Sequence, residues 1–165
     1  MMRDAPCLEA KQPDRGAVTV GPTSTSLSVT VLSADDAYDY QLQAAQLAAP
    51  LAGSVAIRVF RIPFLAVPVG GPRHGGFYLV PDAGDHTIGT AVCAALSGLH
   101  GFPQLRARWA PAPDYCYVIE WGAEPPTDHD EAVRARFYGY SEQAIRAGRF
   151  TLPPPPRSRV PGSCT

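Results

Sequence analysis

The sequence has almost no net charge and no long hydrophobic run. Its 165 residues include 14 Lys and Arg against 15 Asp and Glu, which gives a formal net charge of −1. The basic excess that is typical of nucleic-acid-binding proteins is therefore absent. No stretch approaches the roughly 18 apolar residues that a membrane span requires. We expect neither nucleic acid nor a membrane as a partner.

Cysteine is scarce and forms no recognisable pair. The sequence has four, at Cys7, Cys93, Cys116 and Cys164, and none lies in a Cys-x-x-Cys motif. We see no charged leader followed by an apolar segment and a cleavage site. Reduced thiols in a cytoplasmic protein are therefore expected.

No metal site or cofactor is expected either. His86, Cys93 and His100 recur at spacings of seven, but seven helical residues rise about 10.5 Å. Two ligands of one zinc lie no more than about 4 Å apart, so Cys93 is interpreted as a core residue. The sequence also lacks a phosphate-binding Gly-Lys-Ser/Thr ending and a Gly-x-Ser-x-Gly elbow. No catalytic residue is assigned, and whether the chain is an enzyme stays open.

The chain is interpreted as one domain with two tails. Residues 1–26 mix charged, small and turn-forming residues without periodicity and are expected to be a disordered arm. Residues 27–150 form the predicted domain. Residues 151–165 include four consecutive prolines, which cannot enter a helix or a central strand, and are expected to be a disordered tail.

The first half of the domain is predicted to contain four strands and one helix. A strand at 27–32 precedes a helix that is capped by Ser33 and buries Tyr38, Leu42 and Ala45. A turn at 61–63 and a loop at 70–76 then arrange three strands as an antiparallel meander. The expected pairs are Val59 with Leu65, Ile57 with Val67, Val55 with Val69, Val69 with Phe77, and Val67 with Leu79.

The second half adds a helix over 85–99, a hairpin and two helices capped by Thr127 and Ser141. In the hairpin, strands 104–109 and 115–121 are expected to set Leu105, Ala107 and Trp109 opposite Ile119, Tyr117 and Tyr115. Local contacts dominate this order, so we predict an α+β fold. Its antiparallel sheet combines the meander, the hairpin and the N-terminal strand, and packs against three to four helices.

Five short segments resemble those of a small actinobacterial family of streptomycete type. They are Asp36-Ala-Tyr-Asp-Tyr40, Ala66-Val-Pro-Val-Gly-Gly-Pro-Arg-His-Gly-Gly76, Gly101-Phe-Pro103, Glu120-Trp-Gly122 and Arg136-Phe-Tyr-Gly-Tyr-Ser141. The resemblance covers residues 36–149. That family is a domain of unknown function, so the resemblance implies no activity, cofactor or catalytic residue.

The glycine-rich turn at 70–76 is the strongest candidate for a ligand site. Its glycines tolerate conformations in which N–H groups converge on an anion, and Arg73 could pair with a carboxylate or phosphate. His74 would act as a general acid or base. The alternative is a hairpin loop whose glycines satisfy turn geometry. The candidate residues are Gly70, Gly71, Arg73, His74, Gly75 and Gly76.

Arg106, Arg108 and Asp114 of the hairpin would complete this site if the two hairpins shared a rim. The alternative for the two arginines is a solvated face, with Arg106 diagonal to Glu120 in a weak ion pair. Cys116 lies beside both arginines and could have a lowered pKa, although no base is placed to use it.

Two functions remain open on this basis. The first is a non-enzymatic binding or accessory protein, which self-associates through a sheet edge or contacts another protein. The alternative is a small enzyme or a binder of an anionic metabolite that uses Arg73 and His74. The aromatic residues at 137–140 are interpreted as docking the last helices on the sheet.

Overall fold

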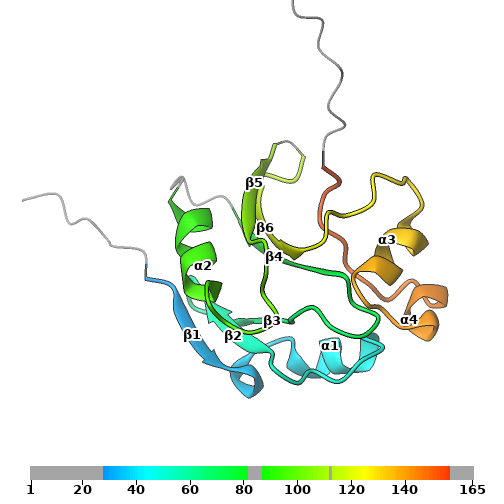
Figure 1. Ribbon diagram of the computed structural model, residues 1–165, viewed down its shortest axis with the longest axis horizontal. Helices are drawn as coiled ribbons and strands as arrows, with labels where there is room; N and C mark the ends of the chain where they lie inside the picture. Colours follow the sequence, from blue (N-terminus) through cyan, green and yellow to red (C-terminus); the bar gives the residue numbers. More distant parts are fainter. Residues whose placement is uncertain (1–27, 82–86, 112, 157–165) are drawn as a thin grey trace, which may run out of the picture.

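The computed structural model describes residues 28–81, 87–111 and 113–156. Within these ranges the chain forms α-helices, one 3-10 helix and short strands (Figure 1). The expected α+β class is confirmed. The elements are, in order, β1 (Thr30–Ser33), the 3-10 helix (Ala34–Asp36), α1 (Tyr40–Gln46), β2 (Val55–Arg58), β3 (Phe64–Ala66), β4 (Gly75–Pro81), α2 (Ile88–Leu96), β5 (Arg106–Ala110), β6 (Cys116–Gly122), α3 (Glu131–Phe137) and α4 (Glu142–Arg146).

The strands pair into two antiparallel sheets rather than one. β1, β2 and β3 lie side by side in the first sheet, and β4, β6 and β5 in the second. The expected pairing of Val67 with Leu79 is therefore wrong, because Leu79 pairs with Val118 of β6. β3 ends at Ala66, shortly before Pro68, which has no N–H to continue the ladder.

The register within the first sheet also differs from the expected one. Val55 lies opposite Ala66, where the sequence predicted Val69. This shift is an odd number of residues, so it exchanges the two faces of the strand. The cause is the connection between β2 and β3, because residues 59–63 form a loop instead of extending both strands.

The hairpin of β5 and β6 is confirmed, with a shift of two residues. Trp109 lies opposite Tyr117 rather than Tyr115, and Arg106 lies directly opposite Glu120 rather than diagonal to it. A shift by two keeps each side chain on its predicted face. The turn has the predicted five residues but lies one position further along the chain, at 111–115, because β5 extends to Ala110 and Tyr115 adopts a left-handed conformation (φ 41°) outside β6.

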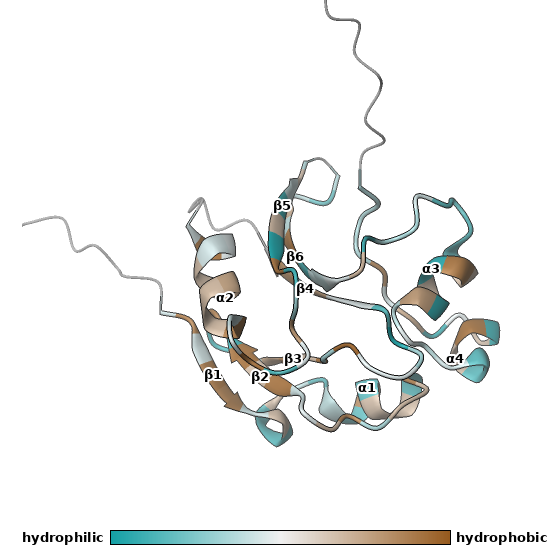
Figure 2. Cartoon of the chain, in the orientation of Figure 1, coloured by the Kyte–Doolittle hydropathy of each residue, from teal (hydrophilic) through white to brown (hydrophobic). Residues whose placement is uncertain are grey.

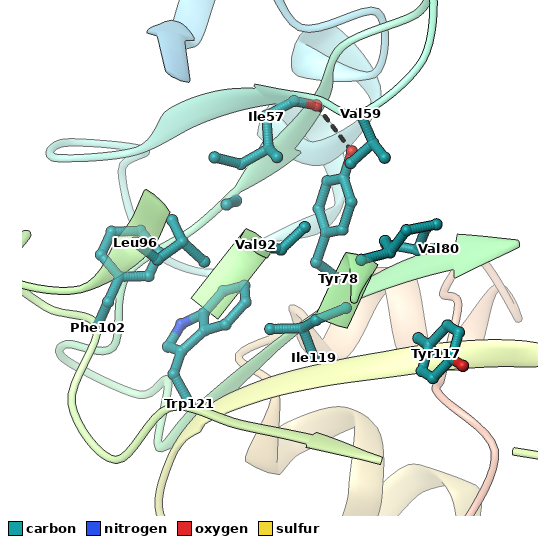
Figure 3. Packing of buried hydrophobic residues seen from close by; sticks show 12 residues of the cluster. Ile57, Val59, Tyr78, Val80, Val92, Leu96, Phe102, Tyr117, Ile119 and Trp121 are labelled. Atoms are coloured by element: carbon teal, nitrogen blue, oxygen red, sulfur yellow. Dashed lines mark hydrogen bonds between the residues drawn. The ribbon is translucent and has the colours of Figure 1, made fainter. Parts of the chain in front are cut away.

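One hydrophobic core joins the two sheets. Side chains of β2, β4, β6 and α2 meet there, as Figure 3 shows. Trp121, Ile119 and Ile57 are fully buried in it. Two hydrogen bonds cross the core: Tyr78 Oη donates to the Ile57 carbonyl (2.7 Å), and Trp121 Nε1 donates to the Val67 carbonyl (3.0 Å). The first sheet is therefore tied to the second by packing and by the Tyr78 hydrogen bond, and Trp121 holds the segment that follows β3.

Smaller apolar clusters cover the outer faces. Ala37 and Leu65 pack between the first sheet and the segment that leads into α1. On the second sheet, Phe77 packs against residues of the α3–α4 region, and its ring meets that of Tyr138 edge-on with centroids 4.9 Å apart. In Figure 2, α3 and α4 carry hydrophilic and hydrophobic residues side by side, as elements at the surface do. The predicted docking role of residues 137–140 agrees with this contact.

The predicted start and burial of the first helix are wrong. Ser33 makes no capping hydrogen bond, the 3-10 helix follows it, and α1 begins only after Asp39. Tyr38 is 78% exposed and Leu42 is 57% exposed, and no residue of α1 is buried. The cause is a tertiary contact that local sequence does not reveal. The Asp39 carboxylate accepts a hydrogen bond from the Leu65 amide of β3 (2.8 Å), which fixes where the helix begins.

The remaining helix ends fit the sequence in part. Ser141 caps α4 as predicted, its hydroxyl accepting from the Ala144 amide (3.1 Å). α3 is capped by Asp130, three residues after the predicted Thr127. α2 is shorter than predicted, and Leu99 lies beyond its end.

Residues 151–156, the first part of the predicted tail, lie against the domain. Pro153 is fully buried. The carbonyl of Pro153 accepts a hydrogen bond from Arg134, and the carbonyl of Pro154 accepts one from Arg108. The predicted arm at 1–26 and the remainder of the tail lie outside the described residues.

Candidate functional site

The structure does not bring the predicted site residues into one pocket. Arg73 lines one groove, His74 lines a second hollow, and Asp114 lines a third. Arg106 and Arg108 lie on β5, where both contact Glu120. The adjacency of the two hairpins at a common rim is thus absent among the described residues.

Three amides of the glycine-rich turn, those of Gly70, Arg73 and His74, donate within the protein. Gly70 and Arg73 exchange two backbone hydrogen bonds of 3.0 Å, and the His74 amide donates to the Phe137 carbonyl (3.0 Å). Gly75 and Gly76 belong to β4 and pair with β6. These amides do not converge on a common point, so the geometry favours the turn interpretation over an anion-binding nest.

Gly75 and Gly76 make room for aromatic rings. A Cβ on Gly76 would lie 2.2 Å from atoms of the Trp121 indole, and one on Gly75 would lie 2.4 Å from the Phe137 ring. The glycines that attracted a ligand interpretation therefore serve packing at these two positions.

Arg106 and Arg108 hold a buried carboxylate. Glu120 is 3% exposed and lies 3.5 Å from Arg106 Nε and 3.2 Å from Arg108 Nη2. Arg106 also donates to the carbonyls of Gly122 (3.0 Å) and Ala123 (2.9 Å). Both guanidinium groups thus have internal partners that stabilise the second sheet.

The two cysteines within the described ranges, Cys93 and Cys116, are not activated. Burial raises the pKa of the Cys116 thiol and Asp114 raises it further, which outweighs the lowering by Arg108. The lowered pKa considered from the sequence is therefore wrong. Burial also raises the pKa of Cys93. In the described ranges, no group of three or more His, Cys, Asp or Glu side chains is placed to hold a metal ion.

His74 lines a hollow of about 620 Å³ between the turn and α3. Its ring centroid lies 6.3 Å from that of Phe137. The cation of this hollow, Arg136, is already paired with Glu142 at 2.6 Å. Besides Arg136 and Glu142, the wall includes the carboxylate of Glu124. Since the described residues of its wall include no unpaired Lys or Arg, this hollow is a poor match for the predicted anion.

A groove of about 620 Å³ runs beside β4, and we call it the β4 groove. Its walls come from α1 and the residues before it, from β3, from the β5–β6 turn and from residues 151–154. Four of its apolar side chains are well exposed: Tyr38 (78%), Leu42 (57%), Phe64 (42%) and Tyr115 (58%). Sequence reasoning missed this groove, because it placed Tyr38 and Leu42 in the core and the last wall in a tail.

The edge of β4 that faces away from β6 is unpaired. Pro81 lacks an N–H, so it cannot donate a hydrogen bond to β6. It therefore occupies a position of the β4–β6 ladder at which the backbone groups of β4 point away from β6. Alternation then directs the amides and carbonyls of Leu79 and Phe77 outward as well. In the part of the chain that the structure describes, no other strand pairs with this edge. Phe77, Tyr78 and Leu79 all line the β4 groove.

Comparison with known proteins places the chain in a family without assigning a role. No curated protein and no solved structure shows a significant match to it. The profile of a family of unknown function, DUF6302, matches residues 31–165, which is longer than the stretch expected from the five short segments. The chain therefore belongs to the DUF6302 family of unknown function.

Proposed function

We propose that the chain is a non-enzymatic binding protein that holds an extended segment of a partner protein in the β4 groove. The observation that carries this proposal is the coincidence of exposed aromatic side chains with an unpaired strand edge in one groove. Strand addition uses such an edge for main-chain hydrogen bonds and uses adjacent pockets for alternate side chains.

The exposed side chains suit the contact surface of a partner. Tyr38 and Phe64 pack edge-on with ring centroids 6.2 Å apart, and Leu42 lies in the same wall. Tyrosine and phenylalanine are enriched in protein interfaces because they bury large area at low conformational cost. Exposed apolar groups grouped in a groove are typical of an interaction site.

The charges of the groove favour a cationic partner. Asp39 and Asp114 line it, and among the described residues no Lys or Arg does. Asp39 is engaged by the Leu65 amide and by Gln43 Nε2 (3.2 Å), which leaves Asp114 as the freer carboxylate. A segment with apolar side chains and a Lys or Arg near Asp114 would complement this surface.

The walls favour a single strand over a whole sheet edge. α1 and β3 flank the edge of β4 on one side, and residues 151–154 flank it on the other. If a second copy of this chain paired through the same edge, its own α1, β3 and residues 151–154 would have to fit into the same groove. We therefore assign the groove to a peptide segment rather than to self-association.

The test uses a fluorescent heptapeptide of alternating Lys and Val, its Glu/Val counterpart and a backbone N-methylated version. We expect the Lys peptide to bind, and the other two to bind about tenfold more weakly or not at all. The double variant Tyr38→Ala/Leu42→Ala should weaken binding about tenfold. Both side chains are exposed, so folding should be unaffected. Leu99→Ala, at an exposed apolar residue outside the groove, is the matched control.

Fluorescence anisotropy measures the affinity, and light scattering gives the oligomeric state. Equal binding of the Lys and Glu peptides would overturn the proposal, and so would insensitivity to the groove variants. A dimer that dissociates in the Tyr38→Ala/Leu42→Ala variant would assign the groove to a second copy and would likewise overturn it.

A further inference from the structure

We propose that the groove lined by Arg73, which is distinct from the His74 hollow, binds a small monocarboxylate with an apolar body, which Arg73 holds. This groove has a volume of about 310 Å³. Its walls are the segment after α1 (Leu47–Ala52), the segment after β3 (Val67–Gly71) and Gly139, which are apolar throughout. Arg73 is the one charged side chain among the described residues that line it. The inference is independent of the β4 groove.

Arg73 is a buried cation whose hydrogen bonds are incomplete. The residue is 8% exposed, and its Nη1 donates to the Tyr138 carbonyl at 2.5 Å. Its Nε is buried and has no partner. No carboxylate in the described ranges lies within ion-pair distance of it, whereas Arg106 and Arg108 share Glu120.

An unpaired buried guanidinium is costly, and this cost indicates a missing partner. Burial lowers the pKa of Arg73 to about 10, so the group keeps its charge at neutral pH. The Tyr138 carbonyl caps the C-terminal end of α3 and offsets part of this charge. Nε still loses its hydrogen bond to water without a replacement, and a buried donor in that state is destabilising.

One nitrogen of the Arg73 guanidinium remains for a carboxylate. Nη1 is used by Tyr138, and Nε is buried out of reach of a ligand in the groove. Nη2 is the nitrogen that remains to donate to a carboxylate oxygen. Arg134 also has a buried Nε without a partner, but Pro153 is packed over it. Arg73, in contrast, lines an open groove.

The surroundings define the class of ligand. One cation matches one negative charge, and the apolar walls match a hydrocarbon or aromatic body. A phosphate dianion would find no second cation, and the amides of Gly70 and Arg73 are used by the turn. His74 lies in the other hollow, so it supplies no acid or base here. The site is therefore a binding site rather than a catalytic one.

The test measures binding of hexanoate and benzoate to the full chain by calorimetry, with hexanol and inorganic phosphate as comparison ligands. We expect the carboxylates to bind about tenfold more tightly than hexanol, because the alcohol carries no negative charge to pair with Arg73. Phosphate should not bind. Arg73→Met should abolish the difference between hexanoate and hexanol.

Ala52→Phe tests the groove without changing Arg73, so it applies even if Arg73→Met does not fold. Ala52 is exposed at the mouth of the groove, so Ala52→Phe should fill the groove, leave Arg73 in place and weaken hexanoate about tenfold. Ala123→Phe, at an exposed alanine outside the groove, should bind as the wild type does. The proposal is overturned if wild type binds no carboxylate, if hexanol binds equally well, or if Ala52→Phe retains full affinity.

Discussion

At Gly76, one hydrogen atom in place of a methyl group lets the Trp121 indole lie against the backbone of β4. A Cβ at this position would lie 2.2 Å from Trp121 Cε2 and Nε1. Gly76→Ala must therefore displace a fully buried side chain and its hydrogen bond to Val67. We expect a loss of about 1–3 kcal/mol in the free energy of unfolding, as overpacked cores show. Urea unfolding followed by tryptophan fluorescence measures it.

Gly98→Ala separates this clash from backbone strain. Gly98 has a φ of 82°, and nothing lies within 4 Å of the position of its Cβ. Its replacement should cost about 1 kcal/mol through the left-handed conformation alone. If Gly76→Ala proved no more destabilising than Gly98→Ala, the indole would be free to move and the packing argument would be contradicted.

The chemical role of single residues was only partly predictable from the sequence. Tyr138 makes the predicted contact with the sheet, through the ring of Phe77. Large aromatic side chains gain much from burial, so this contact could be expected from the residue type. Arg73 was predicted to bind an anion together with His74, but its burial and its separation from His74 depend on α3, which is distant in the sequence. The partners of a buried charge are set by tertiary contacts, and local patterns do not contain them.

For whole elements, local signals succeeded where local contacts decide the outcome. The Ser141 cap and the faces of the β5–β6 hairpin follow from spacing along a short stretch. The start of α1 did not, because Asp39 is bound to the Leu65 amide, a residue far along the chain. The loop at 59–63 likewise shifted the register between β2 and β3, because the alternation of apolar residues alone does not specify where the turn lies.

One hydrogen bond between elements tests how firmly the two sheets are joined. Tyr78 Oη of β4 donates to the Ile57 carbonyl of β2 at 2.7 Å within the core. Tyr78→Phe keeps the ring and removes this bond, so we expect a loss of about 1 kcal/mol in the free energy of unfolding. Tyr115→Phe, at a 58% exposed ring, should change it by less than about 0.5 kcal/mol. Equal effects in urea unfolding would contradict the proposed link between the sheets.

For the whole molecule, the arrangement of sheets was the least predictable feature. Each strand pattern was compatible with one continuous sheet, yet β3 and β4 belong to different sheets that share a core. The β4 groove is assembled from α1, β3, β4, the β5–β6 turn and residues 151–154. A site built from segments so far apart leaves no periodic signal in the sequence, whereas fold class does, because it depends on the order of elements.

Buried tyrosines should make the whole fold sensitive to alkaline pH. Burial is the main cause that raises the pKa of Tyr78, Tyr138 and Tyr140 above the ordinary value of 10.0. A raised folded pKa gives stability that is complete below the unfolded pKa and is lost as pH rises towards the folded pKa. Each tyrosine lowers stability by about 1.4 kcal/mol per pH unit in that window. The lowered pKa of Arg73 acts in the opposite direction.

Three tyrosines outweigh one arginine, so the free energy of unfolding should fall steeply above pH 10. Urea unfolding at a series of alkaline pH values measures the slope, and phenolate absorbance reports which rings ionise only as the protein unfolds. Tyr78→Phe removes one of the three groups and should make the slope shallower by about 1.4 kcal/mol per pH unit. A stability that stays level above pH 10, or a slope that Tyr78→Phe leaves unchanged, would mean that these phenols ionise without opening the core. The core that joins the two sheets would then be accessible to water in the folded state.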